Sequence, residues 1–373
     1  MELTKSKFKQ TEIGWIPEDW KVKSVEEVVT ISTGSKNTQD RVSDGKYPFY
    51  VRSQTVERIN SYSYNCEAVL TAGDGVGTGK IYHYVNHKFE LHQRVYIMNN
   101  FATELHGYYF YLFFSNSFFD RIMQMTAKSS VDSVRREMIA DMLIPLPPLP
   151  EQCAIAQVLS DTDQLLQAMT QQIAKKRAIK QGAMQRLLTP GEGWEVRRLG
   201  EVCDFLDNQR RPIKSAEREF IKGEYPYYGA SGIIDYVNDY IFDDELILLG
   251  EDGENILSRN LPLVFKVKGK IWVNNHAHVL KAKKGFDTDY LTEYLESLDY
   301  SLLNSGTAQP KLNKRVCSNI KLHIPTLQEQ TRIATILSDM DAELVQLEEK
   351  LQKYERVKQG LMQQLLTGKI RLV

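Results

Sequence analysis

Cysteine is scarce in this sequence and is scattered along it. The 373 residues include four cysteines, none of them in a C-x-x-C pair: Cys66, Cys153, Cys203 and Cys317. This spacing argues against a disulfide framework and against a zinc site. Because unpaired cysteines suit a reducing compartment, we expect a cytoplasmic protein.

Long apolar runs and an excess of charge are also missing. The longest aromatic-rich run covers seven residues, 108–114, whereas a membrane span needs about 18. The opening residues are polar and charged, unlike a secretory signal, so we expect no membrane contact. The formal net charge is −1, so the total charge gives no sign of a nucleic-acid binder.

Catalytic signatures are absent as well. The glycine-rich stretch 73–80 lacks the G-x-x-x-x-G-K-[ST] spacing of a phosphate loop, which favours a tight hairpin. His83 and His87 lack the glutamate of an H-E-x-x-H motif. His276 and His278 fall on one face of an expected strand, where hydrogen bonding is commoner than metal binding. No [ND]-P-P-[YF] motif of an amino-methyltransferase occurs. We therefore expect a non-catalytic chain without a metal or cofactor.

The sequence does contain one unit written twice. Residues 151–189 and 329–367 align without a gap and are identical at 18 of 39 positions. Upstream, weaker matches keep their order, such as Asp74-Gly75 with Asp252-Gly253. The repeat predicts four parts: a globular domain at 1–150, a helix at 151–189, a second globular domain at 190–325, and a second helix with a tail at 326–373.

Each globular domain is expected to have a mixed α/β (α+β) fold. Short strand-like runs, such as 240–242 and 271–273, alternate with turn signals. The segments 108–115 and 290–297 look helical. The aromatic residues at 108–114 are interpreted as core rather than as a base-stacking surface.

The repeated segments predict two long helices that pair as a coiled coil. Apolar residues recur in steps of seven. The expected seam consists of Leu159, Leu166, Ile173 and Leu187 in the first helix and Ile333, Leu337, Met340, Leu344, Leu347, Leu351 and Leu365 in the second. Thr326 and Glu329 form an expected capping box. Gly182 and Gly360 are expected to allow a close helix–helix approach.

The two helices are expected to run antiparallel. A helix of 39 residues is about 58 Å long, whereas the domain at 190–325 should be only about 35–40 Å across. That domain is too small to carry the chain back to the start of a parallel partner. The basic residues of the first helix lie at 175–186, and the second helix begins with acidic residues. Antiparallel pairing would therefore bring opposite charges together, hold the two domains apart and relate the repeats by a pseudo-twofold axis.

Basic residues gather locally although the total charge is almost zero. The three groups are Arg210, Arg211, Lys214 and Arg218; Lys311, Lys314 and Arg315; and, at the repeat-related place, Lys128, Arg135 and Arg136. A local patch is enough for contacts with DNA phosphates. A solvated surface explains the same groups equally well.

Four segments together resemble a known family, the specificity subunit of type I restriction-modification systems. They are 11–20 (TEIGWIPEDW), 147–156 (PPLPEQCAIA), 306–312 (GTAQPKL) and 360–369 (GLMQQLLTGK). The resemblance implies two target-recognition domains that each read half of an interrupted DNA site. It further implies helices that space these domains and dock two modification subunits, which bind S-adenosylmethionine and methylate adenine. Restriction subunits would add ATP-driven translocation and cleavage.

The resemblance also implies where DNA is contacted. The loop 307–315 and its counterpart 126–135 resemble a family motif that precedes a helix, and 251–259 with 274–276 resembles one type of recognition domain. Asn, Gln, Arg and His suit base edges, and Lys and Arg suit phosphates. The expected DNA contacts are Lys128, Ser129, Arg135, Arg136, Arg210, Arg211, Asn255, Arg259, Asn275, His276, Gln309, Lys311, Asn313 and Lys314. Asp74 and Asp252 fit turn formation as well as DNA contact.

Two other classes of protein stay open. A free-standing DNA methyltransferase or nuclease is disfavoured by the missing motifs. A coiled-coil scaffold without a nucleic-acid function would explain the helices but not the paired variable domains.

Overall fold

The computed structural model describes residues 7–125, 133–304, 306 and 309–372. Contacts within the chain divide it into two units. The first unit comprises 1–168 and 351–373, and the second unit comprises 169–350. Each long helix thus contributes one end to each unit.

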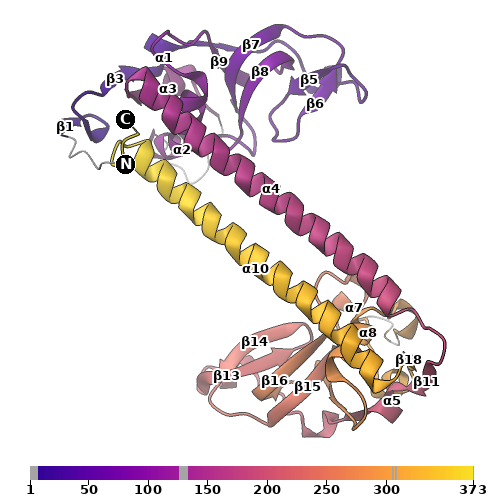
Figure 1. Ribbon diagram of the computed structural model, residues 1–373. Coiled ribbons are helices and arrows are strands. Elements are labelled where there is room, and N and C mark those ends of the chain that lie inside the picture. Colours follow the sequence, from indigo (N-terminus) through magenta and orange to yellow (C-terminus); the bar gives the residue numbers. More distant parts are fainter. Residues whose placement is uncertain (1–6, 126–132, 305, 307–308, 373) are drawn as a thin grey trace. The chain divides into compact units, whose positions relative to one another are not determined.

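The first unit is built on a mixed six-stranded sheet (Figure 1). Its strand order is β4 (Thr30–Thr33), β9 (Val95–Asn99), β7 (Tyr64–Ala72), β8 (Tyr82–Leu91), β5 (Tyr47–Tyr50) and β6 (Glu57–Ile59). The pairing is antiparallel except between β5 and β8. The other elements are the pairs β1 (Phe8–Thr11) with β2 (Gly14–Pro17) and β3 (Lys21–Ser24) with β10 (Leu143–Leu146), and the short or packed helices α1 (Val25–Val28), η1 (Thr38–Asp40), α2 (Gly107–Met125) and α3 (Arg136–Ala140).

The second unit repeats the order of this six-stranded sheet strand by strand. Its sheet order is β12 (Cys203–Phe205), β17 (Ala277–Ala282), β15 (Phe242–Gly250), β16 (Val264–Val273), β13 (Lys222–Gly229) and β14 (Gly232–Val237). The other elements are β11 (Glu195–Arg198) with β18 (Lys321–Ile324), α5 (Leu199–Val202), η2 (Asp207–Gln209), α6 (Ser215–Arg218), α7 (Asn255–Ser258), α8 (Thr288–Glu296), η3 (Ser301–Leu303) and α9 (Lys314–Ser318). The mixed α/β fold and the internal repeat are thereby confirmed.

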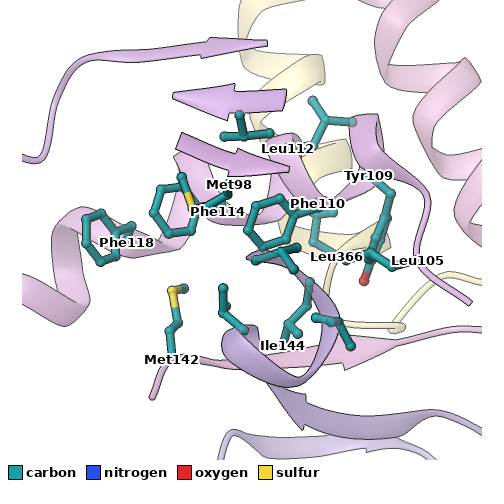
Figure 2. Close-up of a cluster of buried hydrophobic side chains, with 14 of the residues drawn as sticks. Met98, Leu105, Tyr109, Phe110, Leu112, Phe114, Phe118, Met142, Ile144 and Leu366 are labelled. Carbon is teal, nitrogen blue, oxygen red and sulfur yellow. The ribbon is translucent and has the colours of Figure 1, made fainter. Parts of the chain in front are cut away.

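The aromatic residues of α2 form the core of the first unit, as predicted. Phe110, Phe114 and Phe118 are fully buried, and neighbouring ring centroids are 5.5 and 4.4 Å apart. Figure 2 shows the three rings side by side, with Met142 near them. Because residues four apart share one face of a helix, this spacing turns a single aromatic stripe towards the sheet.

Four of the expected local elements are confirmed and one is mostly wrong. The helices expected at 108–115 and 290–297 correspond to α2 and α8, and the run 271–273 is the end of β16. Of the run 240–242, only Phe242 belongs to a strand. The stretch 73–80 connects the antiparallel strands β7 and β8 and is therefore a hairpin loop, as predicted.

The two long helices are α4 (Leu149–Leu187) and α10 (Leu327–Leu365), each of 39 residues. In the second unit, Lys180 donates to Asp341 at 2.6 Å and Lys176 donates to Glu343 at 2.8 Å. In the first unit, Lys358 binds Asp163. Rising numbers on α4 therefore meet falling numbers on α10 in the second unit, and the antiparallel pairing is confirmed. Within the described part of the chain, no helix is both long and apolar enough to cross a membrane.

All residues of the predicted seam are buried or half-buried. Leu159, Ile333 and Leu337 are fully buried. Thr326 precedes α10 and its hydroxyl accepts from the Glu329 N–H at 3.4 Å, which is half of the predicted capping box. The Glu329 carboxylate instead binds Arg332.

The role expected for the two helical glycines is wrong. A Cβ atom added to Gly182 or to Gly360 would meet no atom within 4 Å. Neither glycine therefore permits a close approach of the two helices within the chain.

A buried glutamine fixes the start of each long helix. The Gln152 amide donates to Pro147 O at 2.8 Å, and its oxygen accepts from His106 N at 2.9 Å. The Gln330 amide donates to Pro325 O at 2.9 Å, and its oxygen accepts from Asp287 N at 2.9 Å. This shared role explains why the Glu-Gln pair recurs in both copies of the repeat.

The C-terminal segment belongs to the first unit through Arg371. Its guanidinium donates to the buried Glu151 at 2.6 Å and to Asp19 at 2.7 Å. Glu151 also accepts from the Trp20 indole at 3.0 Å. These bonds tie the end of the chain to the start of α4 and to the segment before β3.

Candidate nucleic-acid interface

In each unit a carboxylate follows a central strand of the sheet. Asp74 comes after β7 and Asp252 comes after β15. Asp74 forms an isolated antiparallel bridge with Ser133, and Asp252 forms one with Lys311. The segment that precedes α3 or α9 is therefore docked on the end of its sheet at the same place in both units.

Backbone hydrogen bonds extend this equivalence to the triplets that precede β9 and β17. These triplets are 92–94 (His-Gln-Arg) and 274–276 (Asn-Asn-His). The first N–H of each donates to a matching tyrosine carbonyl, Tyr50 at 3.0 Å or Tyr228 at 3.1 Å. The third N–H of each donates to the side chain of the first residue, at 3.0 Å and 2.7 Å respectively. The two triplets thus occupy equivalent positions with different side chains.

The third side chain of each triplet rests on the carboxylate. Arg94 donates to Asp74 Oδ2 at 3.1 Å, and Arg52 donates to Oδ1 at 2.7 Å. His276 Nδ1 lies 2.9 Å from both carboxylate oxygens of Asp252. The side chains of Arg94 and His276 are 64% and 50% exposed, whereas both aspartates are sheltered. In each unit an aspartate therefore supports an exposed side chain at the third position of the triplet, Arg94 or His276.

Sequence reasoning names Asn275 and His276 as candidates but does not name Gln93 and Arg94, which occupy the equivalent positions of the first unit. Gln93 is exposed and donates to Asn37 at 2.6 Å. One signal in the sequence could have located Gln93 and Arg94. The Asp-Gly pair occurs in both repeats, at 74–75 and 252–253, and it marks the same end of the two sheets. The two triplets differ at each of their three positions, so an alignment of the repeats by identity does not match them.

Arg210, an expected DNA contact, lies largely in the interior of the second unit. Its guanidinium donates to Glu251 at 2.7 Å and to Ala277 O at 2.7 Å, and the side chain is 13% exposed. Glu251 also binds Lys311 at 3.3 Å, and half of the Lys311 side chain is exposed. Arg211 is exposed, and its carbonyl accepts from the Trp272 indole at 2.6 Å.

Asn255 and Arg259 hold the loop that follows Asp252. The Asn255 side chain exchanges two hydrogen bonds with the backbone of Leu261, both 2.9 Å long. Arg259 has a φ of 50° and pairs with Glu296 at 2.8 Å. Both side chains therefore have partners within the loop and its surroundings.

The remaining expected contacts cluster before α9 and α3. Asn313 caps α9 by accepting from Val316 N at 2.9 Å, and Lys314 lies 5.4 Å from the Phe205 ring. Gln309 and Lys314 are exposed, as are Arg135 and Arg136 in the first unit. Arg136 lies 3.6 Å from Glu26. Lys128 and Ser129 lie outside the described residues.

Comparison with known proteins identifies this arrangement. A family described as "Type I restriction modification DNA specificity domain" matches residues 17–176 and 191–359, which is most of the chain. The chain belongs to this family. Its two matched segments coincide with the two copies of the repeated fold.

Individual relatives agree with the family. The chain is 27% identical, over 98% of its length, to a putative type I restriction enzyme MjaX specificity subunit of Methanocaldococcus jannaschii, 97% of which is covered. A putative type I restriction enzyme specificity subunit of Haemophilus influenzae is 37% identical over 42% of this chain and 39% of that protein. The crystal structure of an S subunit from M. genitalium shares the fold, with a TM-score of 0.67, 18% identity and coverage of 96% and 98% of the two chains.

A buried histidine ties the α9 loop of this specificity-domain protein to its sheet. His278 Nδ1 lies 2.8 Å from Asp207, and Nε2 lies 2.8 Å from Leu312 O. Both partners are acceptors, so the ring carries two protons. Burial alone lowers the pKa of His278, but hydrogen bonds to Asp207 and Cys317 raise the pKa to about 10. In the first unit, Tyr96 OH makes the equivalent bond to Val134 O at 3.2 Å.

The two histidines do not share one strand face, so that expectation is wrong. His278 lies in β17, whereas His276 precedes the strand. Each binds a different aspartate, which agrees with the hydrogen-bonding interpretation.

Proposed function

We propose that this chain is the non-catalytic DNA-recognition subunit of a type I restriction-modification complex, and that each globular domain reads one half of an interrupted DNA target. The observation that carries this proposal is that both units build the same arrangement at one end of the sheet. There, an aspartate supports an exposed side chain, which is Arg94 in the first unit and His276 in the second. A shared framework with different exposed side chains suits two half-sites of different sequence.

The long helices are proposed to dock two modification subunits. Ile179 on α4 and Val357 on α10 are repeat-equivalent, and they are 46% and 44% exposed. Gly182 and Gly360 follow them at equivalent positions and also face open space. A matched pair of apolar, sterically open sites is what two identical partners require.

The chemistry is assigned to these partners. Modification subunits would bind S-adenosylmethionine and methylate adenine, and restriction subunits would use ATP to translocate and cleave DNA. The chain itself would bind no cofactor and would act in the cytoplasm.

Methylome sequencing of the host with and without this gene tests the proposal. We expect adenine methylation at one interrupted sequence that disappears with the gene and returns with a plasmid copy. Methyl transfer by the purified chain alone would instead show an enzyme. Absence of any DNA binding when the modification subunits are present would show a scaffold.

A further inference from the structure

A polar hollow in the first unit surrounds the Asp74 carboxylate. It is lined by Asn37, Thr38, Gln39, Arg52, Asp74, His92, Gln93 and Arg94. Apart from Asp74, its side chains are donors or mixed donors and acceptors, which suits the edge of a base rather than an apolar ligand.

The side chain of Asp74 has a role that turn formation does not explain. The backbone of Asp74 forms the bridge to Ser133, which does not involve the carboxylate. The two carboxylate oxygens bind two different guanidinium groups, those of Arg52 and Arg94. A charged hydrogen bond at each oxygen holds both arginines in place before any ligand arrives.

Of the two arginines, Arg94 is the better placed to contact DNA. Its side chain is 64% exposed, compared with 42% for Arg52, and its bond to Asp74 is the longer one. Only Nη1 of Arg94 is used in that bond, out of five N–H donors on the guanidinium. Arg94 also occupies the position that His276 holds on Asp252 in the second unit.

We propose that Arg94, positioned by Asp74, reads a guanine in the half-site bound by the first unit. A planar guanidinium donates two parallel hydrogen bonds to O6 and N7 of guanine in the major groove, and no other base offers this pair of acceptors. This inference rests on the proposed function, because it requires the domain to bind DNA. Asp74 acts as a positioning residue and does not itself contact the base.

The test uses the full chain assembled with its modification subunits, with binding selected from random DNA. Arg94→Lys keeps the charge but removes the bidentate donor pair. We expect the preference for guanine to fall at least about fivefold at one position of one half-site. The other half-site should be unchanged, which also shows that the variant has folded. Asp74→Asn should weaken the preference at the same position, and Asp74→Glu should restore part of it.

Arg41→Lys is the matched control. Arg41 is 59% exposed in the same unit and donates to one carboxylate, Glu57, at 3.1 Å, but it does not line the hollow. It should leave the selected sequence unchanged. The proposal is overturned if Arg94→Lys gives the wild-type sequence, or if it weakens binding to all sequences equally, as a phosphate contact would. If the wild-type complex selects no sequence at all, the proposed function itself fails.

Discussion

The end of the sheet around Asp74 in the first unit and the matching place around Asp252 in the second share their backbone and the aspartate but differ in the other side chains. Asp74 and Asp252 form equivalent backbone bridges, and the carbonyls of Tyr50 and Tyr228 accept equivalent hydrogen bonds. The exposed residue is arginine in one unit and histidine in the other. The framework that positions a recognition side chain can therefore stay constant while the side chain itself changes.

The second difference between the two sheet ends is the group that ties the loop to the sheet. A phenol, Tyr96, holds Val134 in the first unit, whereas a buried imidazolium, His278, holds Leu312 in the second. The imidazolium needs a counter-charge, which Asp207 supplies. The second unit thus uses a buried ion pair where the first uses one neutral hydrogen bond.

Removal of His278 should have the largest effect. His278→Phe removes the hydrogen-bonded counter-charge of the buried Asp207, which keeps Arg210 at 3.9 Å and the Val279 N–H at 2.9 Å. The expected loss of stability is about 3 kcal/mol, the lower end of the range for a broken buried pair.

His278→Tyr supplies the group that the first unit uses and should retain more protection of the Leu312 amide. The Leu312 N–H donates to Glu251 O at 2.7 Å while the loop is docked, so its hydrogen exchange checks both variants, with Tyr96→Phe as the neutral counterpart. Equal protection of Leu312 in His278→Phe and wild type would contradict the tether.

The same tether predicts a dependence on pH in the second unit only. The pKa of His278 is about 10 in the folded chain and about 6.5 in an unfolded one. Because folding raises this pKa, its contribution to stability is complete below about pH 6.5 and is lost as the pH rises through about 10. Protection of the Leu312 amide should therefore decline over this range more than that of Val134. A parallel decline would place the pH dependence elsewhere.

Substitutions on the proposed docking sites for the modification subunits should have the next largest effect. Ile179→Asp and Val357→Asp each place a charge on an exposed apolar site. Each should weaken binding of one modification subunit by about 2 kcal/mol if the site is a hot spot. Gln171→Asp, on an exposed position of α4, is the control. Binding stoichiometry from light scattering should fall from two partners towards one for either single variant. Two partners bound with unchanged affinity would exclude these sites.

Phosphate binding by the loop before α9 should have a smaller and non-selective effect. Replacing Lys311 and Lys314 with Ala should weaken DNA binding for all sequences and lower the salt slope by about one for each phosphate that is no longer bound. Changing Asn275 or His276 should instead alter the preferred sequence in one half-site. Lys268→Ala is the control, since this lysine is 77% exposed in the same unit. An unchanged salt slope would place the loop away from the DNA backbone.

The sequence predicts the helices well and the recognition end of each sheet only in part. Heptad spacing is a local signal, so the two helices and their apolar faces follow from it. The antiparallel pairing follows from the size expected for the domain at 190–325 and from the charges of the two helices. Neither the order of the strands nor the role of Arg94 can be predicted from the sequence. The equivalence of Arg94 and His276 depends on which strands pair, and no local pattern shows that. The error at Gly182 and Gly360 has another cause. Identity between repeats shows that a glycine is needed but not which side of the helix needs it.

The smallest expected effect concerns the helical glycines and separates two explanations for them: a close approach between the two helices, and an open surface for a partner. Gly182→Ala and Gly360→Ala each add a methyl group where no atom lies within 4 Å. Because glycine in a helix is less stable than alanine by about 0.5–1 kcal/mol, each change should stabilise the isolated chain by that amount. Had the glycines allowed a close helix–helix approach, the same change would destabilise it. Denaturant unfolding of the isolated chain gives the sign, and titration with modification subunits shows whether the added methyl groups hinder docking there.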